Sequence, residues 1–148
     1  MTTAATAQLH VAEPPASYLV RPPLVVDCSV LSSALFNEDT RLQALQSMAG
    51  RMLHAPHLLD HEIVSVALKK SRLGWSAEVI ADALADYSVQ EIEMHATQAE
   101  AQHELAGRYG LSSYDAAYLW LAAALKAPLA TFDKKLATAA KVHLASLP

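Results

Sequence analysis

The sequence predicts an α/β fold, a sandwich in which helices flank a central, mostly parallel sheet. Short apolar runs typical of buried strands alternate along the chain with longer segments of helical periodicity. The length of 148 residues suits one compact domain. A hydrophobic content of 53% with 18% charged residues indicates a folded globule rather than a disordered chain.

The first 23 residues differ in composition from the rest. They are rich in Ala, Thr and Pro, with breakers at Pro14-Pro15 and Pro22-Pro23. We therefore expect a flexible tail or arm over residues 1–23 and a folded domain over residues 24–148. The tail lacks the basic start and apolar core of a secretory signal, and no run reaches the ~18 apolar residues of a membrane span. The single Cys28 excludes an intramolecular disulfide and fits a reducing cytoplasm.

The first half of the domain shows both kinds of periodicity. The apolar run at residues 24–26 predicts a buried strand, and the stripe Leu59, Ile63, Val66 predicts a helix. Gly74 is expected to stop that helix and Ser76 to cap the next one. In order, we expect a strand at 24–26, helices over 29–36 and 40–51, a strand over 52–55 ending at Pro56, and helices over 58–70 and 76–85.

The second half repeats this alternation. Apolar residues at 89, 92 and 94 predict a short strand, and Gly110 is a natural end for the helix before it. We expect a strand within 89–94, helices over 96–109 and 113–126, a strand over 128–131 and a last helix over 133–140.

Two aspartates follow predicted strands. Asp27 ends the run at 24–26, and Asp133 follows the run at 129–132. Ligand sites in parallel α/β sheets lie outside the carboxyl ends of strands, which places both acids for function. The alternative is that each acid only caps the helix that follows it.

Two further acids lie on apolar helix faces. Glu62 has Leu58 and Val66 as its neighbours one turn away, so its charge needs compensation by a metal or by a base such as Lys69. Asp115 shares a face with Tyr118 and other apolar residues. It also has the spacing of a capping box with Ser112 as N-cap, which is its purely structural interpretation.

Four carboxylates in this order suit divalent-metal chemistry. Magnesium prefers hard oxygen ligands, and two such ions can cleave a phosphodiester bond. A net charge of −4 argues against nucleic-acid binding by a broad basic surface, but bound cations would present positive charge to phosphate. The cation would also relieve the repulsion among the acids.

Four segments resemble one known family, the PIN domains. Residues 25–31 resemble their opening strand and turn, residues 111–119 their most recognisable motif, and residues 129–136 their last acidic motif. Residues 61–63 are similar to the family's glutamate position. Together these segments span about residues 24 to 140, and their order is more specific than any single acid.

The nearest resemblance is to the VapC-like toxins of bacterial type II toxin–antitoxin pairs. It implies a PIN-like α/β/α sandwich and an endoribonuclease that depends on Mg2+ or Mn2+. It also implies a homodimer and a small antitoxin whose tail enters the acidic groove. The catalytic, metal-binding residues implied are Asp27, Glu62, Asp115 and Asp133, with Ser29 and Thr131 lining the same site. PIN domains usually begin almost at their first strand, so the tail is a mis-assigned start, an oligomer arm or a real addition.

Other functions were weighed against this hypothesis. A phosphatase using Asp27 as a covalent nucleophile would carry a second acid two residues on, where this chain has Ser29. A catalytically idle PIN-like module that binds RNA or a protein is a second alternative, against which the presence of all four acids argues. His57 and His61 flank Asp60 rather than a glutamate, so we interpret them as surface residues and not as a zinc-protease motif.

Several other residues have a structural interpretation or leave their role open. Cys28 is expected to be a buried apolar residue rather than a nucleophile, and Trp75 and Trp120 to pack rather than to stack on bases. The basic cluster Lys69, Lys70 and Arg72 suits either phosphate contact or a solvated helix end. A mean hydropathy of +0.18 leaves apolar surface for self-association.

Overall fold

The computed structural model describes residues 8–10, 12 and 21–148. The tail predicted over residues 1–23 lies mostly outside these residues. A four-stranded sheet with the strand order β3-β2-β1-β4 organises the described part, and every strand pair is parallel. The strands are β1 (Pro23–Val26), β2 (Met52–Pro56), β3 (Ile92–His95) and β4 (Leu129–Ala130). The helices are α2 (Cys28–Leu35), α3 (Arg41–Met48), α4 (Leu58–Arg72), α5 (Ala77–Ser88), α6 (Ala99–Tyr109), α7 (Ser113–Leu125) and α8 (Lys134–Ala145).

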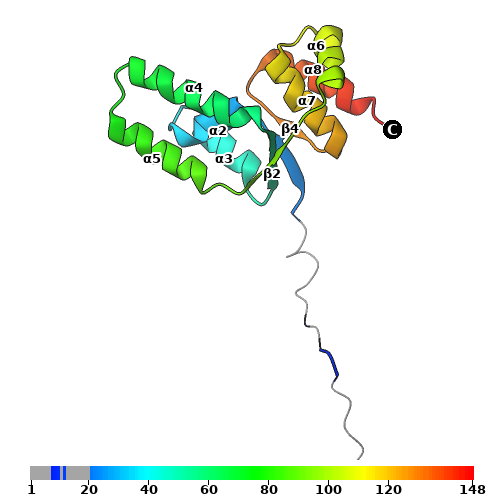
Figure 1. Ribbon diagram of the computed structural model, residues 1–148, viewed down its shortest axis with the longest axis horizontal. Helices are drawn as coiled ribbons and strands as arrows, with labels where there is room; N and C mark the ends of the chain where they lie inside the picture. Colours follow the sequence, from blue (N-terminus) through cyan, green and yellow to red (C-terminus); the bar gives the residue numbers. More distant parts are fainter. Residues whose placement is uncertain (1–7, 11, 13–20) are drawn as a thin grey trace, which may run out of the picture.

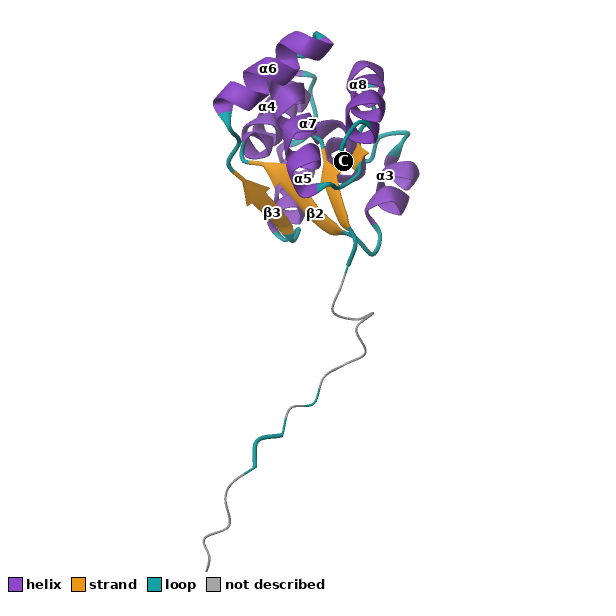
Figure 2. Ribbon diagram, turned by 90° about the vertical axis from the view of Figure 1, so that its right-hand side faces the viewer, coloured by secondary structure: helices purple, strands orange, loops and turns teal. Residues whose placement is uncertain are grey.

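Helices cover the sheet on both sides, as the sequence predicts. Figure 1 shows α2, α4 and α5 on one side of the strands and α6, α7 and α8 on the other. Helix α7 packs on β1, β2 and β4, and α8 on β4. In Figure 2, β3 lies at the edge of the sheet next to β2. In the part of the chain that the structure describes, every helix is too short or too polar to cross a bilayer.

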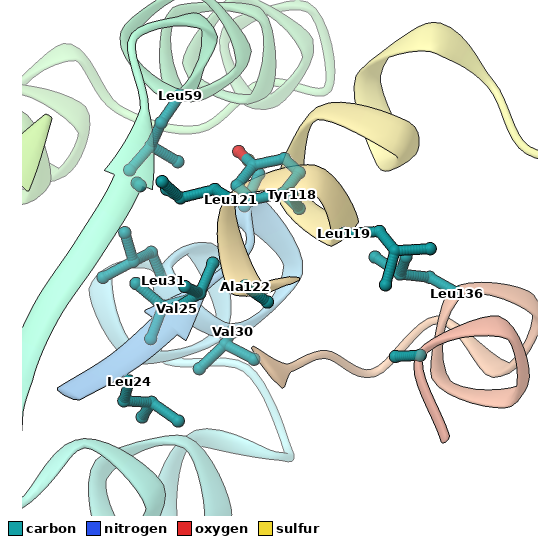
Figure 3. Close-up of a cluster of buried hydrophobic side chains, with 14 of the residues drawn as sticks. Leu24, Val25, Val30, Leu31, Leu59, Tyr118, Leu119, Leu121, Ala122 and Leu136 are labelled. Carbon is teal, nitrogen blue, oxygen red and sulfur yellow. The ribbon is translucent and has the colours of Figure 1, made fainter. Parts of the chain in front are cut away.

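The core lies where both helix layers meet the sheet. Val25 and Val26 of β1 are fully buried, as are Leu119 of α7 and Leu136 of α8. Figure 3 shows side chains from β1, α2, α4, α7 and α8 meeting in this core. Because β1 is central and covered on both faces, its apolar residues run continuously instead of alternating with polar ones. This core fixes the carboxyl ends of β1 and β4, where two of the candidate acids lie.

Some element bounds differ from the predicted ones. Helix α3 spans Arg41–Met48 rather than 40–51, because Gly50 adopts a left-handed conformation with φ of 71° that ends the helical segment. Helix α5 extends to Ser88, and there Tyr87 donates a hydrogen bond to Asp60 of α4 at 2.6 Å. The longer α5 moves β3 to 92–95, later than the predicted 89–94. Helix α6 starts at Ala99 instead of residue 96.

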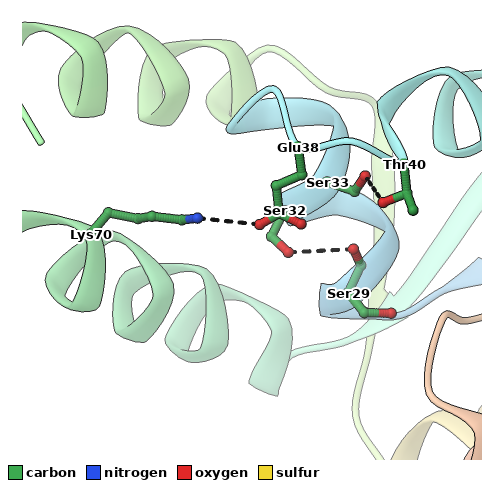
Figure 4. A network of polar contacts seen from close by, with 6 residues as sticks. All are labelled: Ser29, Ser32, Ser33, Glu38, Thr40 and Lys70. Atoms are coloured by element: carbon green, nitrogen blue, oxygen red, sulfur yellow. Dashed lines mark hydrogen bonds and ion pairs between the residues drawn. The ribbon is translucent and has the colours of Figure 1, made fainter. Parts of the chain in front are cut away.

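A polar network joins α2 to α4 on one side of the sheet. Figure 4 shows Lys70 paired with Glu38 at 3.3 Å, and Ser33 bonded to Thr40 at 2.6 Å. The Lys70 ammonium also lies 4.6 Å from the centre of the Trp75 ring. Lys70 therefore contacts groups of neighbouring segments, which neither interpretation of the basic cluster expects. Trp75 packs against the Phe36 ring and remains partly exposed.

Candidate active site

Asp27 lies at the junction of β1 and α2, and both of its carboxylate oxygens accept hydrogen bonds. Ser29 Oγ donates to Oδ1 at 2.6 Å, and Thr131 Oγ1 donates to Oδ2 at 2.5 Å. The backbone amide of Val30 also donates to Oδ1 at 3.2 Å, so Asp27 is the N-cap of α2. With 4% of its surface exposed, the side chain is held almost entirely by protein groups.

The two hydroxyls connect the turn after β1 to the turn after β4. Ser29 Oγ accepts a bond from the Phe132 amide at 3.0 Å, and Thr131 Oγ1 accepts one from the Asp133 amide at 3.0 Å. Each hydroxyl therefore accepts from a backbone amide and donates to Asp27. The parallel pairing of β1 with β4 brings these turns to the same edge of the sheet. This places Asp27 and Asp133 on neighbouring turns.

Asp133 also caps a helix. Its Oδ1 accepts a hydrogen bond from the amide of Leu136 at 2.8 Å, at the start of α8. Both aspartates are therefore N-caps in the structure, as the capping alternative expects. Capping engages one oxygen through one amide, so it leaves room for a second role. Asp133 is exposed, unlike Asp27.

Glu62 is partnered by a hydroxyl and not by a base. Tyr118 of α7 donates to its Oε1 at 2.6 Å, and that tyrosine is only 1% exposed. None of the ion pairs among the described residues involves Glu62, so the alternative of a charge pair with Lys69 is wrong. Tyr118 therefore fixes the carboxylate of α4 against α7 without neutralising it.

Asp115 lies in the first turn of α7. Its amide donates to Ser112 Oγ at 3.1 Å, which is one half of the predicted capping box. Its side chain is partly exposed. The predicted start of the helix and the N-cap at Ser112 are confirmed.

Electrostatics links the four acids to one another. Burial raises the pKa of Asp27, and hydrogen bonds from Ser29 and Thr131 oppose that rise. The pKa of Glu62 is raised by burial first and then by the charges of Asp27 and Asp115, against the bond from Tyr118. The pKa of Asp115 is raised by burial, then by Asp133 and Asp27, while Lys135 lowers it slightly. Glu62 and Asp115 are therefore close enough to other acids of the group for the neighbouring charges to disfavour their ionisation.

The acids do not form a tight cluster. Among the residues that the structure describes, one group of three His, Cys, Asp or Glu residues has ligand atoms within 4.8 Å of one another: His54, Glu93 and His95. The four candidate acids near the carboxyl ends of the strands are therefore farther from one another than the ligands of a single ion would be. Wider spacing is expected for carboxylates that repel one another.

A cleft of about 410 Å³ opens beside Glu62. Leu58, His61, Ser65 and Val66 of α4 line it together with Glu62, Cys28 and Tyr114. Burial, with the charges of Glu62 and Asp27, raises the pKa of Cys28 to about 12. The thiol consequently stays protonated at neutral pH, which agrees with its interpretation as a buried apolar residue.

Two features of this region were missed from the sequence. Tyr118 was seen only as a member of the apolar face of α7, although a tyrosine on a face shared with an acid signals a possible carboxylate partner. The cluster of His54, Glu93 and His95 is only weakly indicated in the sequence, by a histidine inside an apolar strand. Its members come together only through the pairing of β2 with β3.

Comparison with known proteins identifies a family and several similar proteins for this chain. The PIN domain family matches residues 24–142. A VapC ribonuclease of Mycobacterium bovis is 35% identical over 116 residues, which cover 76% of this chain and 87% of that protein. Ribonuclease VapC9 of Mycobacterium tuberculosis strain H37Rv gives the same identity and coverage.

Two solved structures share the fold. The protein PAE2754 of Pyrobaculum aerophilum aligns with a TM-score of 0.61 and 20% identity, covering 84% of this chain and 88% of its own. VapC20 of Mycobacterium tuberculosis, a toxin described as cleaving the sarcin–ricin loop, aligns with a TM-score of 0.57 and 11% identity, covering 78% and 94%. At these identities the two structures support the fold alone.

Proposed function

The chain belongs to the PIN-domain family, and on that premise we propose that it is a divalent-metal-dependent endoribonuclease, the toxin of a type II toxin–antitoxin pair. Its substrate is RNA, and it acts in the cytoplasm where RNA is made. The proposed catalytic and metal-binding residues are Asp27, Glu62, Asp115 and Asp133. Ser29 and Thr131 support them by holding Asp27.

One observation carries this proposal. Four carboxylates from four segments lie near the carboxyl ends of the parallel strands. The pKa of Glu62 is raised by burial and by the charges of Asp27 and Asp115, and that of Asp115 by burial and by Asp133 and Asp27. No ion pair among the described residues neutralises any of them. Acids concentrated without a base need a cation, and hard oxygen donors are the ligands that Mg2+ and Mn2+ prefer. The residues therefore fit the metal that the family implies.

A bound divalent cation would supply positive charge that attracts the RNA phosphate and stabilises negative charge on its oxygens. The chain's own residues prepare the site for it. Ser29 and Thr131 fix both oxygens of Asp27, and Tyr118 fixes one oxygen of Glu62. Such fixed acids lose little conformational entropy on binding a ligand. Without a cation, the acids and the net charge of −4 would repel the RNA backbone.

The exposed apolar surface supports the proposed partners. Helices α4 and α5 form a projecting hairpin (Figure 1). Its exposed apolar residues are Val64, Leu68, Leu73, Trp75 and Val79. Apolar side chains gathered on one projection favour a protein interface. We infer that this surface serves a second copy of the chain in a homodimer or a cognate antitoxin protein.

Cleavage of RNA by the purified full-length chain tests the proposal. We expect single-turnover cleavage with Mg2+ or Mn2+ and none after metal removal by a chelator. Inactivity with every divalent cation and a broad set of RNAs would contradict the nuclease assignment. In that case RNA binding without cleavage would favour the alternative of a catalytically idle PIN-like module.

A further inference from the structure

We propose that His54, Glu93 and His95 form a second metal site, specific for zinc and separate from the acidic site. The residues come from two neighbouring strands, β2 and β3, at the edge of the sheet. The proposal does not depend on the nuclease activity, because none of the three residues belongs to the acidic quartet.

Strand pairing brings the three side chains together. His54 of β2 lies directly opposite Glu93 of β3 in the parallel register, and paired residues project from the same face. His95 lies two residues after Glu93 on the same strand, so it projects from that face as well. The intervening Met94 lines a pocket on the opposite face with Asp60 of α4. The cluster thus faces the α6–α7 side of the sheet.

The distances match those between ligands on one zinc ion. His54 Nδ1 lies 2.9 Å from His95 Nε2 and 3.6 Å from Glu93 Oε2. Zinc bonds of about 2.0–2.1 Å in tetrahedral geometry put neighbouring ligand atoms about 3.3–3.4 Å apart. The observed pairs bracket that spacing. All three ligand atoms lie within 4.8 Å of one another, so small side-chain adjustments complete the geometry.

The chemistry of the three donors distinguishes this site from the acidic one. Two imidazoles and one carboxylate suit a borderline cation such as Zn2+, whereas Mg2+ prefers oxygen ligands alone. The nitrogens His54 Nδ1 and His95 Nε2 face each other. Without a cation these two nitrogens share a hydrogen bond that one ring donates. Once that proton moves to the other nitrogen of the same ring, both nitrogens present lone pairs to a cation. Three protein ligands leave a fourth position for water.

Burial makes the site both ordered and accessible. His54 is 8% exposed and anchored within β2, while the Glu93 side chain is 53% exposed. A cation can therefore enter from solvent past Glu93 and meet a fixed imidazole. Binding would link the side chains of the paired strands β2 and β3 across this face of the sheet.

Zinc titration of the metal-free, full-length chain tests the proposal. Isothermal titration calorimetry is run in excess Mg2+, which occupies oxygen sites, and the probe is Zn2+ alone. We expect one Zn2+ per chain. The melting temperature should rise on the order of 5–10 °C when free Zn2+ is about 100 times its Kd. Co2+ should give the visible absorption of a tetrahedral site.

Four variants locate the binding. His95 and Glu93 are at least partly exposed, so both can be replaced without opening the core. A change to a group that only orients a metal ligand weakens binding roughly 10- to 100-fold, and His95→Ala and Glu93→Gln, which remove a ligand, should weaken Zn2+ binding by more. His103→Ala changes an exposed histidine of α6 outside the cluster and should bind normally. Asp27→Asn should also bind normally. No Zn2+ binding by the wild type, unchanged binding by His95→Ala, or loss of binding by Asp27→Asn would overturn the proposal.

Discussion

At the scale of single residues, Asp27 is a helix cap that accepts more hydrogen bonds than a cap requires. It caps α2 through the Val30 amide, and it receives bonds from Ser29 and Thr131 on its two oxygens. A helix cap needs only one acceptor, which Asn supplies about as well as Asp. The two additional hydroxyl donors are what a site demands of a carboxylate that must keep its charge and its orientation.

Tyr118→Phe tests the support of Glu62. The variant removes the donor at 2.6 Å and leaves a partly buried carboxylate without that bond. We expect the free energy of unfolding to fall by about 1–3 kcal/mol at neutral pH, because hydrogen bonds to charged groups are among the stronger ones. Chemical denaturation measures it, and Tyr114→Phe, at an exposed tyrosine, is the control. Equal stability of the two variants would refute the supporting role of Tyr118.

The pH dependence of stability tests the burial of Asp27. A carboxyl whose pKa is raised in the folded state stabilises the fold below its unfolded pKa, and this contribution is lost as the pH rises through the folded value. The metal-free Asp27→Asn variant has no carboxyl at this position, so it does not lose stability in this way as the pH rises. Its melting temperature relative to wild type should therefore rise as the pH increases from about 4, the ordinary value of an aspartate, through the raised value of the folded state.

The difference between the two proteins cancels the opposite effect of His54 and His143, whose pKa values are lowered mainly by burial. A difference in melting temperature that stays constant across this range would show that Asp27 titrates as in the unfolded chain.

At the scale of elements, sequence patterns located every strand and helix of the described domain but not all of their ends. The caps at Ser76 and Ser112 and the stop at Gly110 were predictable, because each depends on one residue's local chemistry. The ends of α5 and β3 were not. They depend on a contact of Tyr87 with Asp60, 27 positions apart, that no local pattern contains.

Ser112→Ala tests how the start of α7 positions Asp115. Loss of the N-cap should lower the free energy of unfolding by about 1 kcal/mol. It should also reduce the stabilisation by Mg2+, because the first turn that carries Asp115 loosens. Thermal melts with and without Mg2+ measure both effects, with the exposed Ser113→Ala as the matched control. An unchanged Mg2+ response would mean that Asp115 does not depend on this cap.

At the scale of the whole molecule, three of the four candidate acids stand at local signals, a strand end or a helix start. The parallel pairing of β1 with β4 explains why Asp27 and Asp133 lie on neighbouring turns, whereas Glu62 and Asp115 come from α4 and α7. The hydrogen bonds that hold these acids could not be predicted from the sequence. The bond from Tyr118 to Glu62 joins residues 56 positions apart, and that from Thr131 to Asp27 joins residues 104 positions apart. The pairing of His54 with Glu93 likewise needs the register of β2 and β3.

The exposed apolar surface of the molecule predicts self-association. The exposed apolar residues of the α4–α5 hairpin should be covered in a two-fold dimer. Light scattering at micromolar concentration should give twice the 15.9 kDa of one chain. Leu68→Lys, in the exposed surface, should shift the mass towards the monomer, and a wild-type protein of 15.9 kDa would contradict the prediction.

If the carboxylates perform metal-dependent cleavage of RNA, the single-turnover rate of Asp27→Asn in Mg2+ must fall sharply. The variant keeps an acceptor for the cap of α2 but loses the charge that attracts a dication. We predict a fall of at least about 1,000-fold relative to Asp82→Asn, an exposed acid of α5, equal to a barrier increase of about 4 kcal/mol. Its metal-free melting temperature should equal or exceed that of the wild type. Undiminished cleavage by Asp27→Asn would contradict the account.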